Sequence, residues 1–206
     1  MSDASENAAW RLREALLDLC SERGYQSLEL QQLLDRAGVS SEEFHALHAD
    51  LDSCFAAILE GIYGEFFALA QEALHDETGW RDRMRVTGYT LLRYLRRDER
   101  VARLAAVEVQ QAGEQAQQLF LETFNRLVGL IDEGSSEARG AESPGLATAI
   151  GVGGIMFARI QEAVAKDELG MGEEEIPSLM YAAVFPYLGA AAAEEELHIP
   201  PPRNLV

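Results

Sequence analysis

Two histidines and a cysteine are the residues of this sequence that come nearest to a metal site. His45 and His48 stand three positions apart, so a helix would place both on one side, and Cys54 follows soon after. Imidazole nitrogen and thiolate sulfur are ligands that Zn²⁺ prefers. The pattern allows a metal site, and packing or surface roles for the two histidines are the alternative.

Signatures of enzymatic chemistry are missing. The sequence contains no phosphate-binding loop, no G-x-S-x-G, no H-E-x-x-H and no C-x-x-C. We therefore expect neither an enzyme nor a bound cofactor.

Half of the arginines gather in one short part of the chain and could bind an anion. They are Arg81, Arg83, Arg85, Arg93, Arg96, Arg97, Arg100 and Arg103. On one side of a helix they would form a pocket for an anionic effector, but these positions run all around a helix. We expect solvated faces and salt bridges to the acidic remainder of the chain.

The strongest local structure signals lie in residues 29–48. Four apolar residues recur at the spacing of one helical face: Leu30, Leu33, Leu34 and Ala37. Gly38 follows, where a left-handed helix end prefers glycine. Ser40 and Glu43 have the spacing of a capping box, which predicts a second helix directly after the turn. Two short helices joined by a tight turn form a helix-turn-helix.

This arrangement resembles the DNA-binding head of the TetR family of one-component transcriptional regulators. The turn Ala37-Gly38-Val39-Ser40 matches the A-G-V-S turn that usually follows the second helix of the family, and Gly24-Tyr25 is similar to the end of its first helix. The resemblance implies an all-α fold of about nine helices. A small three-helix head would occupy residues 1–49, and a larger domain for effector binding and dimerisation would occupy residues 50–206.

The resemblance also implies which residues of the head contact DNA. They are Arg11, Arg13, Arg36, Ser40, Ser41, Glu42, His45 and His48. Since the family carries aromatic residues where His45 and His48 stand, we expect packing or DNA-facing roles for them, and no metal. Leu51 takes the place of a lysine that usually meets phosphate.

The charge of the head opposes DNA binding. Residues 1–60 contain four arginines and twelve aspartates or glutamates, and the whole chain has a net charge of −18, which repels polyanions. Two hypotheses follow. The protein is a ligand-responsive regulator, a repressor, that binds palindromic operator DNA as a dimer. Alternatively, it is a TetR-fold protein whose acidic head has lost DNA binding, and it binds a small molecule or a protein.

Apolar residues at helical spacing predict helices along most of the chain outside the head motif. Their expected ranges are 6–23, 50–75, 80–97, 100–111, 114–133, 146–166 and 177–192. Asp50 is the expected N-cap of the second of these, and residues 134–145 form the clearest loop. Pro186 should kink the last helix or mark its late turn.

Large apolar residues of the second domain are candidates for lining an effector cavity. They are Trp80, Met84, Tyr89, Phe120, Phe124, Met156 and Phe157. Residues at such spacing are also ordinary core, so both interpretations remain open.

The last two long helices are the expected dimer interface. Their candidate contact residues are Ile150, Gly153, Gly154, Phe157, Tyr181 and Phe185. Glycine inside a helix weakens it, so close helix approach is the expected reason for Gly153 and Gly154. A homodimer with a four-helix interface is predicted.

Composition places the protein in the cytoplasm. The sequence shows no apolar run of membrane-spanning length and no signal-peptide pattern, so we expect no membrane association. Cys20 and Cys54 fall on apolar helical faces, which predicts buried, reduced thiols.

Overall fold

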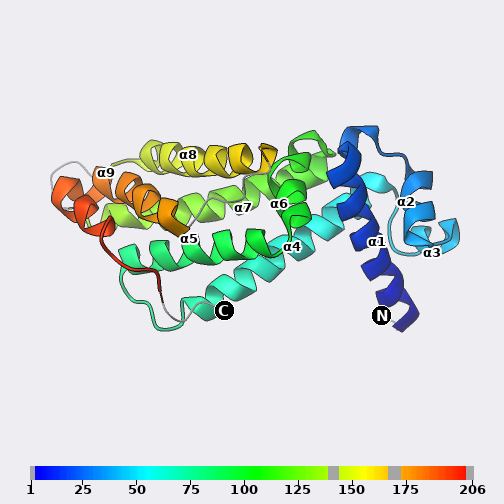
Figure 1. The fold of residues 1–206 in the computed structure, drawn as a ribbon, viewed down its shortest axis with the longest axis horizontal. Coiled ribbons are helices and arrows are strands. Elements are labelled where there is room, and N and C mark those ends of the chain that lie inside the picture. The colour runs from blue at the N-terminus through cyan, green and yellow to red at the C-terminus, as the bar shows by residue number, and fades with distance from the viewer. Residues whose placement is uncertain (1–2, 139–143, 167–172, 203–206) are drawn as a thin grey trace. The chain divides into compact units, whose positions relative to one another are not determined.

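A computed structural model describes residues 3–138, 144–166 and 173–202, and Figure 1 shows its helices in chain order. The α-helices are α1 (Asp3–Arg23), α2 (Leu30–Ala37), α3 (Ser41–His45), α4 (Leu51–Ala73), α5 (Trp80–Arg97), α6 (Glu99–Ala106), α7 (Glu114–Asp132), α8 (Leu146–Ala165) and α9 (Ile176–Glu196). Short 3₁₀ helices are η1 (Tyr25–Ser27), η2 (Glu108–Gln111), η3 (Glu133–Ser136) and η4 (Glu173–Glu175). Within the described ranges there is no strand, so the all-α prediction is confirmed.

The chain divides into two compact units. Unit 1 consists of Met1–Gly64 and Asp98–Leu121, and unit 2 consists of Glu65–Arg97 and Glu122–Val206. Helices α4 and α7 are each divided between the two units: α4 after Gly64 and α7 after Leu121. Unit 1 therefore holds the predicted head together with α6 and η2. The assignment of residues 1–49 and 50–206 to separate functions stays a prediction.

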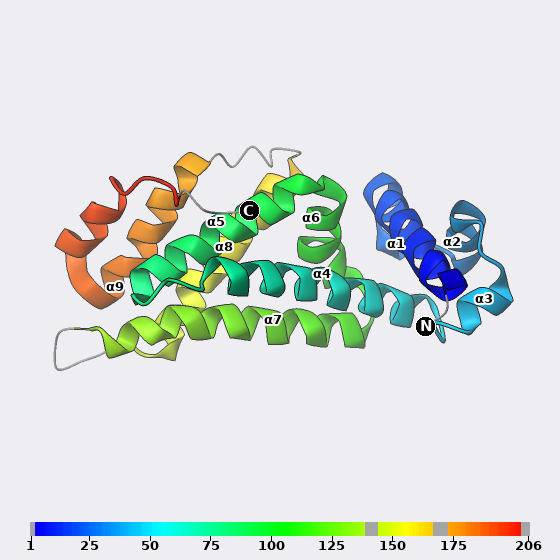
Figure 2. The same ribbon diagram turned by 90° about the horizontal axis from the view of Figure 1, so that it is seen from below.

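In unit 1, α1 is the helix on which the others pack. It contacts α2, α3 and α6, and Figure 2 shows it beside α2 and α3. The largest fully buried apolar side chains of this unit are Leu12, Leu16, Leu17, Leu33, Phe44, Phe55, Leu59, Ile62, Leu104 and Val109. Their burial removes apolar surface from water, which is the main force that holds these short helices in place.

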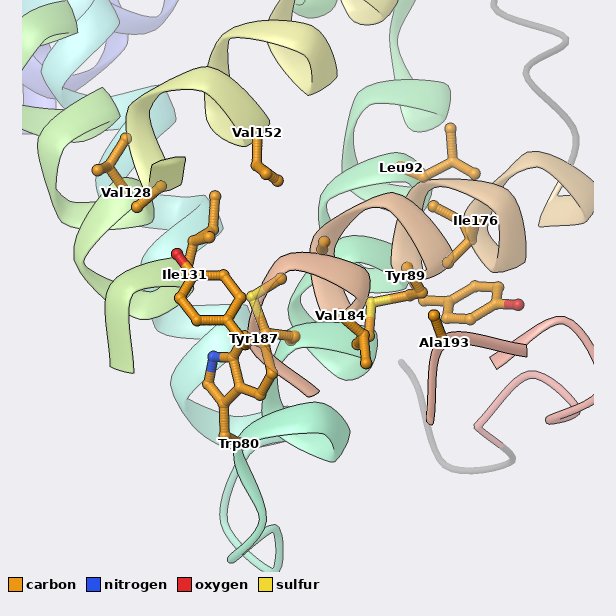
Figure 3. Packing of buried hydrophobic residues seen from close by; sticks show 14 of the residues in the cluster. Trp80, Tyr89, Leu92, Val128, Ile131, Val152, Ile176, Val184, Tyr187 and Ala193 are labelled. Atoms are coloured by element: carbon orange, nitrogen blue, oxygen red, sulfur yellow. The ribbon is translucent and has the colours of Figure 1, made fainter. Parts of the chain in front are cut away.

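In unit 2, one apolar cluster joins α5, α7, α8 and α9, as Figure 3 shows. Trp80 lies at its edge: the indole ring packs on Tyr187 with centroids 5.2 Å apart, and its N–H donates to the Leu130 carbonyl at 2.8 Å. Gly134 of η3 lies against the same ring and leaves no room for a Cβ atom. The predicted loop at 134–145 thus begins within the 3₁₀ helix η3, which lies against the buried Trp80 ring. Residues 139–143 of that loop lie outside the described residues.

Helix α9 bends at Gly189, three residues after the proline that was expected to bend it. Gly189 has φ 81° and ψ −179°, a conformation that is essentially confined to glycine. Pro186 stays within the helical run, so the glycine absorbs the change of direction.

The segment of α9 that follows Gly189 is held on α5 by buried charges. The Glu196 carboxylate, in a residue only 1% exposed, accepts from Arg81 Nε at 2.5 Å and from Arg85 Nη2 at 2.7 Å. Before α9 begins, Glu173 of η4 accepts from Arg93 of α5 at 2.9 Å in a partly exposed pair. For Arg81, Arg85 and Arg93 the expected salt bridges to the acidic remainder of the chain are therefore present.

Two helical segments are long and apolar enough to cross a membrane by length and composition, Leu51–Ala73 and Glu173–Glu196. Both contribute buried residues to the cores described above, and core helices meet the same criterion.

Candidate nucleic-acid interface

The helix-turn-helix is built by local capping. Gly38 ends α2 in the left-handed conformation, with φ 59°, and its N–H donates to the Leu34 carbonyl. At the start of α3 the Ser40 N–H donates to Glu43 Oε2 at 2.8 Å, and the Glu43 N–H donates to Ser40 Oγ at 3.2 Å. Both sequence predictions are therefore confirmed. A second capping box, between Glu29 and Gln32, starts α2 and was not anticipated.

The outer face of α3 is polar and acidic. Ser41, Glu42 and His45 are exposed, whereas Phe44 is fully buried and anchors the helix to the core. His48 is half-buried, and burial lowers the pKa of its imidazole, so it stays neutral at physiological pH. The rings of His45 and His48 lie 5.3 and 5.6 Å from the Phe44 ring, which agrees with packing roles.

The structure gives no support to a metal site at these histidines. No group of three or more His, Cys, Asp or Glu residues in the described part of the chain could hold a metal ion. Cys54 is fully buried, as is Cys20, and burial raises the pKa of both thiols to about 12. The prediction that both cysteines are buried is confirmed, and such thiols are protonated and unreactive.

Two of the three arginines assigned to DNA are engaged within the head. Arg11 Nη1 donates to the Gly38 carbonyl at 2.5 Å and to the Ala37 carbonyl at 3.3 Å, so it caps the end of α2. Arg36 donates both of its terminal nitrogens to Glu22, each at 2.9 Å. This pairing lowers the pKa of the Glu22 carboxyl, which stays charged. Arg13 is half-buried on α1.

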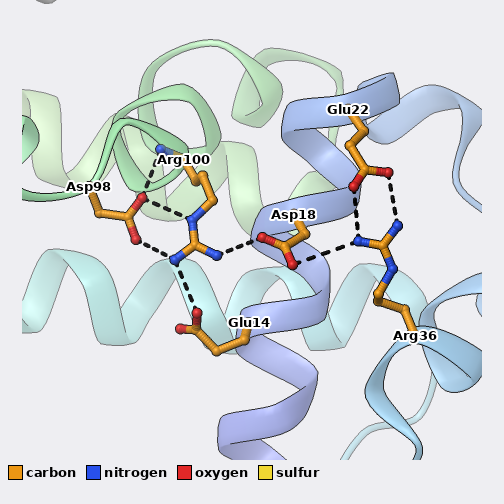
Figure 4. A network of polar contacts seen from close by, with 6 residues as sticks. All are labelled: Glu14, Asp18, Glu22, Arg36, Asp98 and Arg100. Carbon is orange, nitrogen blue, oxygen red and sulfur yellow. Dashed lines mark hydrogen bonds and ion pairs between the residues drawn. The ribbon is translucent and has the colours of Figure 1, made fainter.

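Figure 4 shows that Arg36 belongs to a longer network that ties the motif to α6. Asp18 of α1 lies 3.7 Å from Arg36 and accepts from Arg100 Nη1 at 2.6 Å. Arg100 also donates to Glu14 at 3.0 Å and to Asp98, the N-cap residue of α6, at 2.7 Å. Two guanidinium groups thus share four carboxylates across α1, α2 and the start of α6.

A buried carboxylate makes a second link between the head and this part of unit 1. Glu108 of η2 is 2% exposed and accepts from the Tyr25 backbone N–H at 2.8 Å and from Arg103 Nε at 3.1 Å. Gly24, with φ 76°, brings the Tyr25 amide to that position. The Tyr25 hydroxyl donates to Asp52 in the first turn of α4. The end of α1, the start of α4 and η2 are therefore joined at one point.

The residues predicted to bind an effector do not share one environment. Trp80, Met84 and Tyr89 are buried in the core of unit 2, while Phe124 and Met156 pack partly buried against it. Phe157 is half-buried and contacts the Phe124 ring edge-on at 6.3 Å. Phe120, by contrast, belongs to unit 1.

Two of the large apolar residues predicted at the dimer interface are exposed, and Phe157 and Tyr181 are partly buried. Ile150 is 46% exposed and Phe185 48% exposed, and the Tyr181 ring stacks on Phe185. An added Cβ at Gly154 would meet nothing within 4 Å. Gly153 faces inward instead, where a Cβ would lie 3.1 Å from Val128 Cγ2 of α7. The close approach expected at this glycine occurs within the chain.

No protein-family model matches the sequence, and no curated protein matches it. Solved structures do match its fold. The fatty acid degradation regulator FadR from Bacillus halodurans superposes with a TM-score of 0.72 at 14% identity, covering 86% of this chain and 94% of that one.

Two further solved structures carry bound small molecules. FadR from Bacillus subtilis in complex with stearoyl-CoA has a TM-score of 0.72 at 16% identity, covering 85% of this chain and 97% of that one. RolR in complex with resorcinol has a TM-score of 0.62 at 18% identity, covering 98% of this chain and 99% of that one.

A putative TetR-family regulator from Syntrophomonas wolfei matches similarly, with a TM-score of 0.70 at 16% identity, covering 87% of this chain and 94% of that one. The chain therefore has the fold of the TetR family of transcriptional regulators.

Proposed function

We propose that this protein is a ligand-responsive transcriptional regulator, a repressor, that binds palindromic operator DNA as a homodimer in the cytoplasm. The observation that supports this best is the capped helix-turn-helix, which leaves Ser41, Glu42 and His45 of α3 exposed. Helices of this motif read bases in the major groove with their N-terminal residues. Glu42 could accept a hydrogen bond from a cytosine amino group.

The charges of the head predict an unusual mode of DNA binding. Because Arg11 and Arg36 are engaged inside the head, few cations are left to displace counterions from phosphate. We therefore expect affinity to depend weakly on salt. Non-specific DNA binding should be weak, with a dissociation constant larger than the usual values of roughly 10⁻⁴ to 10⁻⁶ M.

Unit 2 is the proposed effector domain. Among the proteins of this fold, the Bacillus subtilis FadR was solved with stearoyl-CoA and RolR with resorcinol. A small molecule bound in unit 2 of the present chain would bias the position of the heads. Within unit 1, Arg100 links α6 to α1 and Glu108 links η2 to η1, and we expect the head to respond through these two contacts.

Exposed apolar side chains on α8 and α9 support the homodimer. In addition to Ile150 and Phe185, Leu146 is 56% exposed and Ile155 59% exposed. Because α8 and α9 pack on each other, a second copy could cover both in a four-helix interface.

Operator binding is tested by titrating the protein into labelled duplex DNA from the region upstream of its own gene, with a shuffled duplex of equal composition as control. Preferential binding of the upstream duplex, with a shallow salt dependence, is expected. Equal binding of both duplexes, or none at low salt, would rule out the operator hypothesis.

A second candidate function is supported by the same engaged arginines. In this alternative the acidic head has lost DNA binding, and the protein binds a small molecule or another protein. Titration of upstream and shuffled duplex decides between the two functions, and Arg36→Ala tests whether Arg36 contributes to DNA binding or only to the structure of the head. If Arg36 moves from Glu22 to phosphate when DNA binds, the substitution weakens operator binding; if Arg36 only holds α2 on α1, it lowers the unfolding temperature alone.

A further inference from the structure

A buried hydroxyl group in unit 2 has no hydrogen-bond partner. The Tyr187 side chain of α9 is 4% exposed, and among the described residues nothing donates to or accepts from its hydroxyl. Most buried polar groups in folded proteins are paired, and an unpaired one costs free energy. A molecule from outside the chain could supply the missing partner.

Two threonines of α5, Thr87 and Thr90, also have unpaired buried hydroxyls. A helical threonine can satisfy its hydroxyl by rotating toward the carbonyl one turn earlier. Tyr187 has no such option, because its hydroxyl is carried away from its own helix by the ring.

Apolar side chains lie near this hydroxyl, and so does the Asp132 carboxylate. Figure 3 shows the hydroxyl pointing from the Tyr187 ring toward Ile131 of α7. The Tyr187 ring itself packs on Trp80, whose N–H is already satisfied by the Leu130 carbonyl. Phe124, Met156 and other partly buried side chains pack against the same cluster.

The hydroxyl is a neutral donor. Burial raises the pKa of Tyr187, and the nearby negative charge of Asp132 adds to the effect. The proton therefore remains on the oxygen and can be donated to an acceptor. Asp132 itself accepts a hydrogen bond from Ser135 at 3.3 Å.

The charges of unit 2 disfavour an anionic partner. The guanidinium groups of Arg81 and Arg85 are bound to the buried Glu196 carboxylate, and Arg93 is bound to Glu173. An anion buried in the apolar cluster would lose its hydration, and these three guanidinium groups are already engaged with carboxylates. An uncharged molecule avoids this cost.

We propose that the Tyr187 hydroxyl donates a hydrogen bond to the uncharged carbonyl oxygen of an apolar effector that lies between α7, α8 and α9, against Phe124 and Met156. The inference rests on the proposed function, since it names the chemical class of the effector. It also adds Tyr187 to the candidate binding residues, among which the sequence did not place it. Only the unpaired, buried position of the hydroxyl reveals it.

The test uses three probes of similar size on the full chain without DNA. Acetophenone carries a neutral carbonyl, isopropylbenzene replaces that carbonyl with an apolar group, and benzoate is an anion. Calorimetric titration should show acetophenone binding about tenfold more tightly than isopropylbenzene, as one neutral hydrogen bond predicts. Benzoate should bind more weakly than either.

Tyr187→Phe removes only the hydroxyl. In this variant the preference for acetophenone should vanish, while the unfolding temperature of the ligand-free protein stays the same or rises. Tyr181→Phe, on the same helix but half-buried against Phe185, is the matched control and should keep the preference.

Four results would overturn the proposal: the same acetophenone preference in Tyr187→Phe, tighter binding of benzoate, binding of no probe, or a lower unfolding temperature of the variant. The last would mean that the hydroxyl bonds to Asp132 in solution and is structural. Because no DNA is present, failure of operator binding leaves this experiment interpretable.

Discussion

Glu42 and Glu43 are neighbouring carboxylates of α3 with different roles. The Glu43 carboxylate is a hydrogen-bonded part of the capping box, whereas the Glu42 side chain is exposed. Glu42→Lys should therefore raise affinity for any duplex and steepen the salt dependence by about 0.9 for one added phosphate contact. Titrations of labelled duplex at several salt concentrations measure both quantities.

Glu60→Lys is the control for net charge, since Glu60 is also exposed but lies well along α4. An equal gain in affinity from this substitution would mean that the effect is general attraction, and that α3 does not face the groove. Glu43→Lys is less informative, because it also removes a helix cap.

Asp98 contributes to stability in a pH-dependent way. Its hydrogen bonds with Arg100, above all, lower the pKa of its carboxyl from the ordinary value of 3.8. A group with a lowered folded-state pKa stabilises the protein above its unfolded-state pKa, and this contribution disappears as the pH falls through the folded-state value. Asp98→Asn keeps an N-cap but removes the charge.

We therefore expect wild type to be more stable than Asp98→Asn at pH 5, and this difference in unfolding free energy to shrink below about pH 3.8. Denaturant unfolding at a series of pH values from 5 to about 2 measures it. A difference that does not change with pH would show that Asp98 acts as a cap alone.

At the scale of elements, Gly189 decides where α9 changes direction. An alanine there would have to adopt φ 81° with ψ −179°, which costs on the order of 1–3 kcal/mol. Gly189→Ala should lower the unfolding free energy by about that amount, because the alternative of straightening α9 would pull Glu196 away from Arg81 and Arg85. Thermal or denaturant unfolding provides the measurement.

Gly129 of α7 supplies a matched control, since it is an exposed helical glycine with nothing within 4 Å of an added Cβ. Gly129→Ala should stabilise the protein by roughly 0.5–1 kcal/mol through helix propensity. If both substitutions stabilised it equally, Gly189 would not be a conformational requirement.

For the whole molecule, the oligomeric state depends on the exposed apolar face of α8 and α9. Ile150→Glu would place a charge in the centre of the proposed interface and should convert the dimer to a monomer at micromolar concentration. Sedimentation velocity distinguishes the two states. Leu121→Glu introduces the same charge at a residue that is also 50% exposed but lies in unit 1, and it should leave the dimer intact. A wild-type monomer would contradict the proposal outright.

The sequence by itself determined the features that depend on neighbouring residues. Helix ends at Gly38 and Ser40 follow from left-handed glycine and from a capping box, and both signals act within a few residues. Apolar spacing gave the α5 boundaries, Trp80–Arg97, as the structure has them. The fold class followed from the same local patterns and from the motif in the head.

Only the tertiary structure decided what each functional side chain touches. Arg36 lies on α2 and Glu22 on α1, 14 positions apart in the sequence. No local pattern therefore reveals that they bind each other. The direction of Gly153 toward α7, and the unpaired Tyr187 hydroxyl, likewise depend on how α7, α8 and α9 pack. Local spacing specifies which face of a helix is apolar. Contacts between distant parts of the chain decide what that face packs against and which residue each neighbouring charged side chain binds.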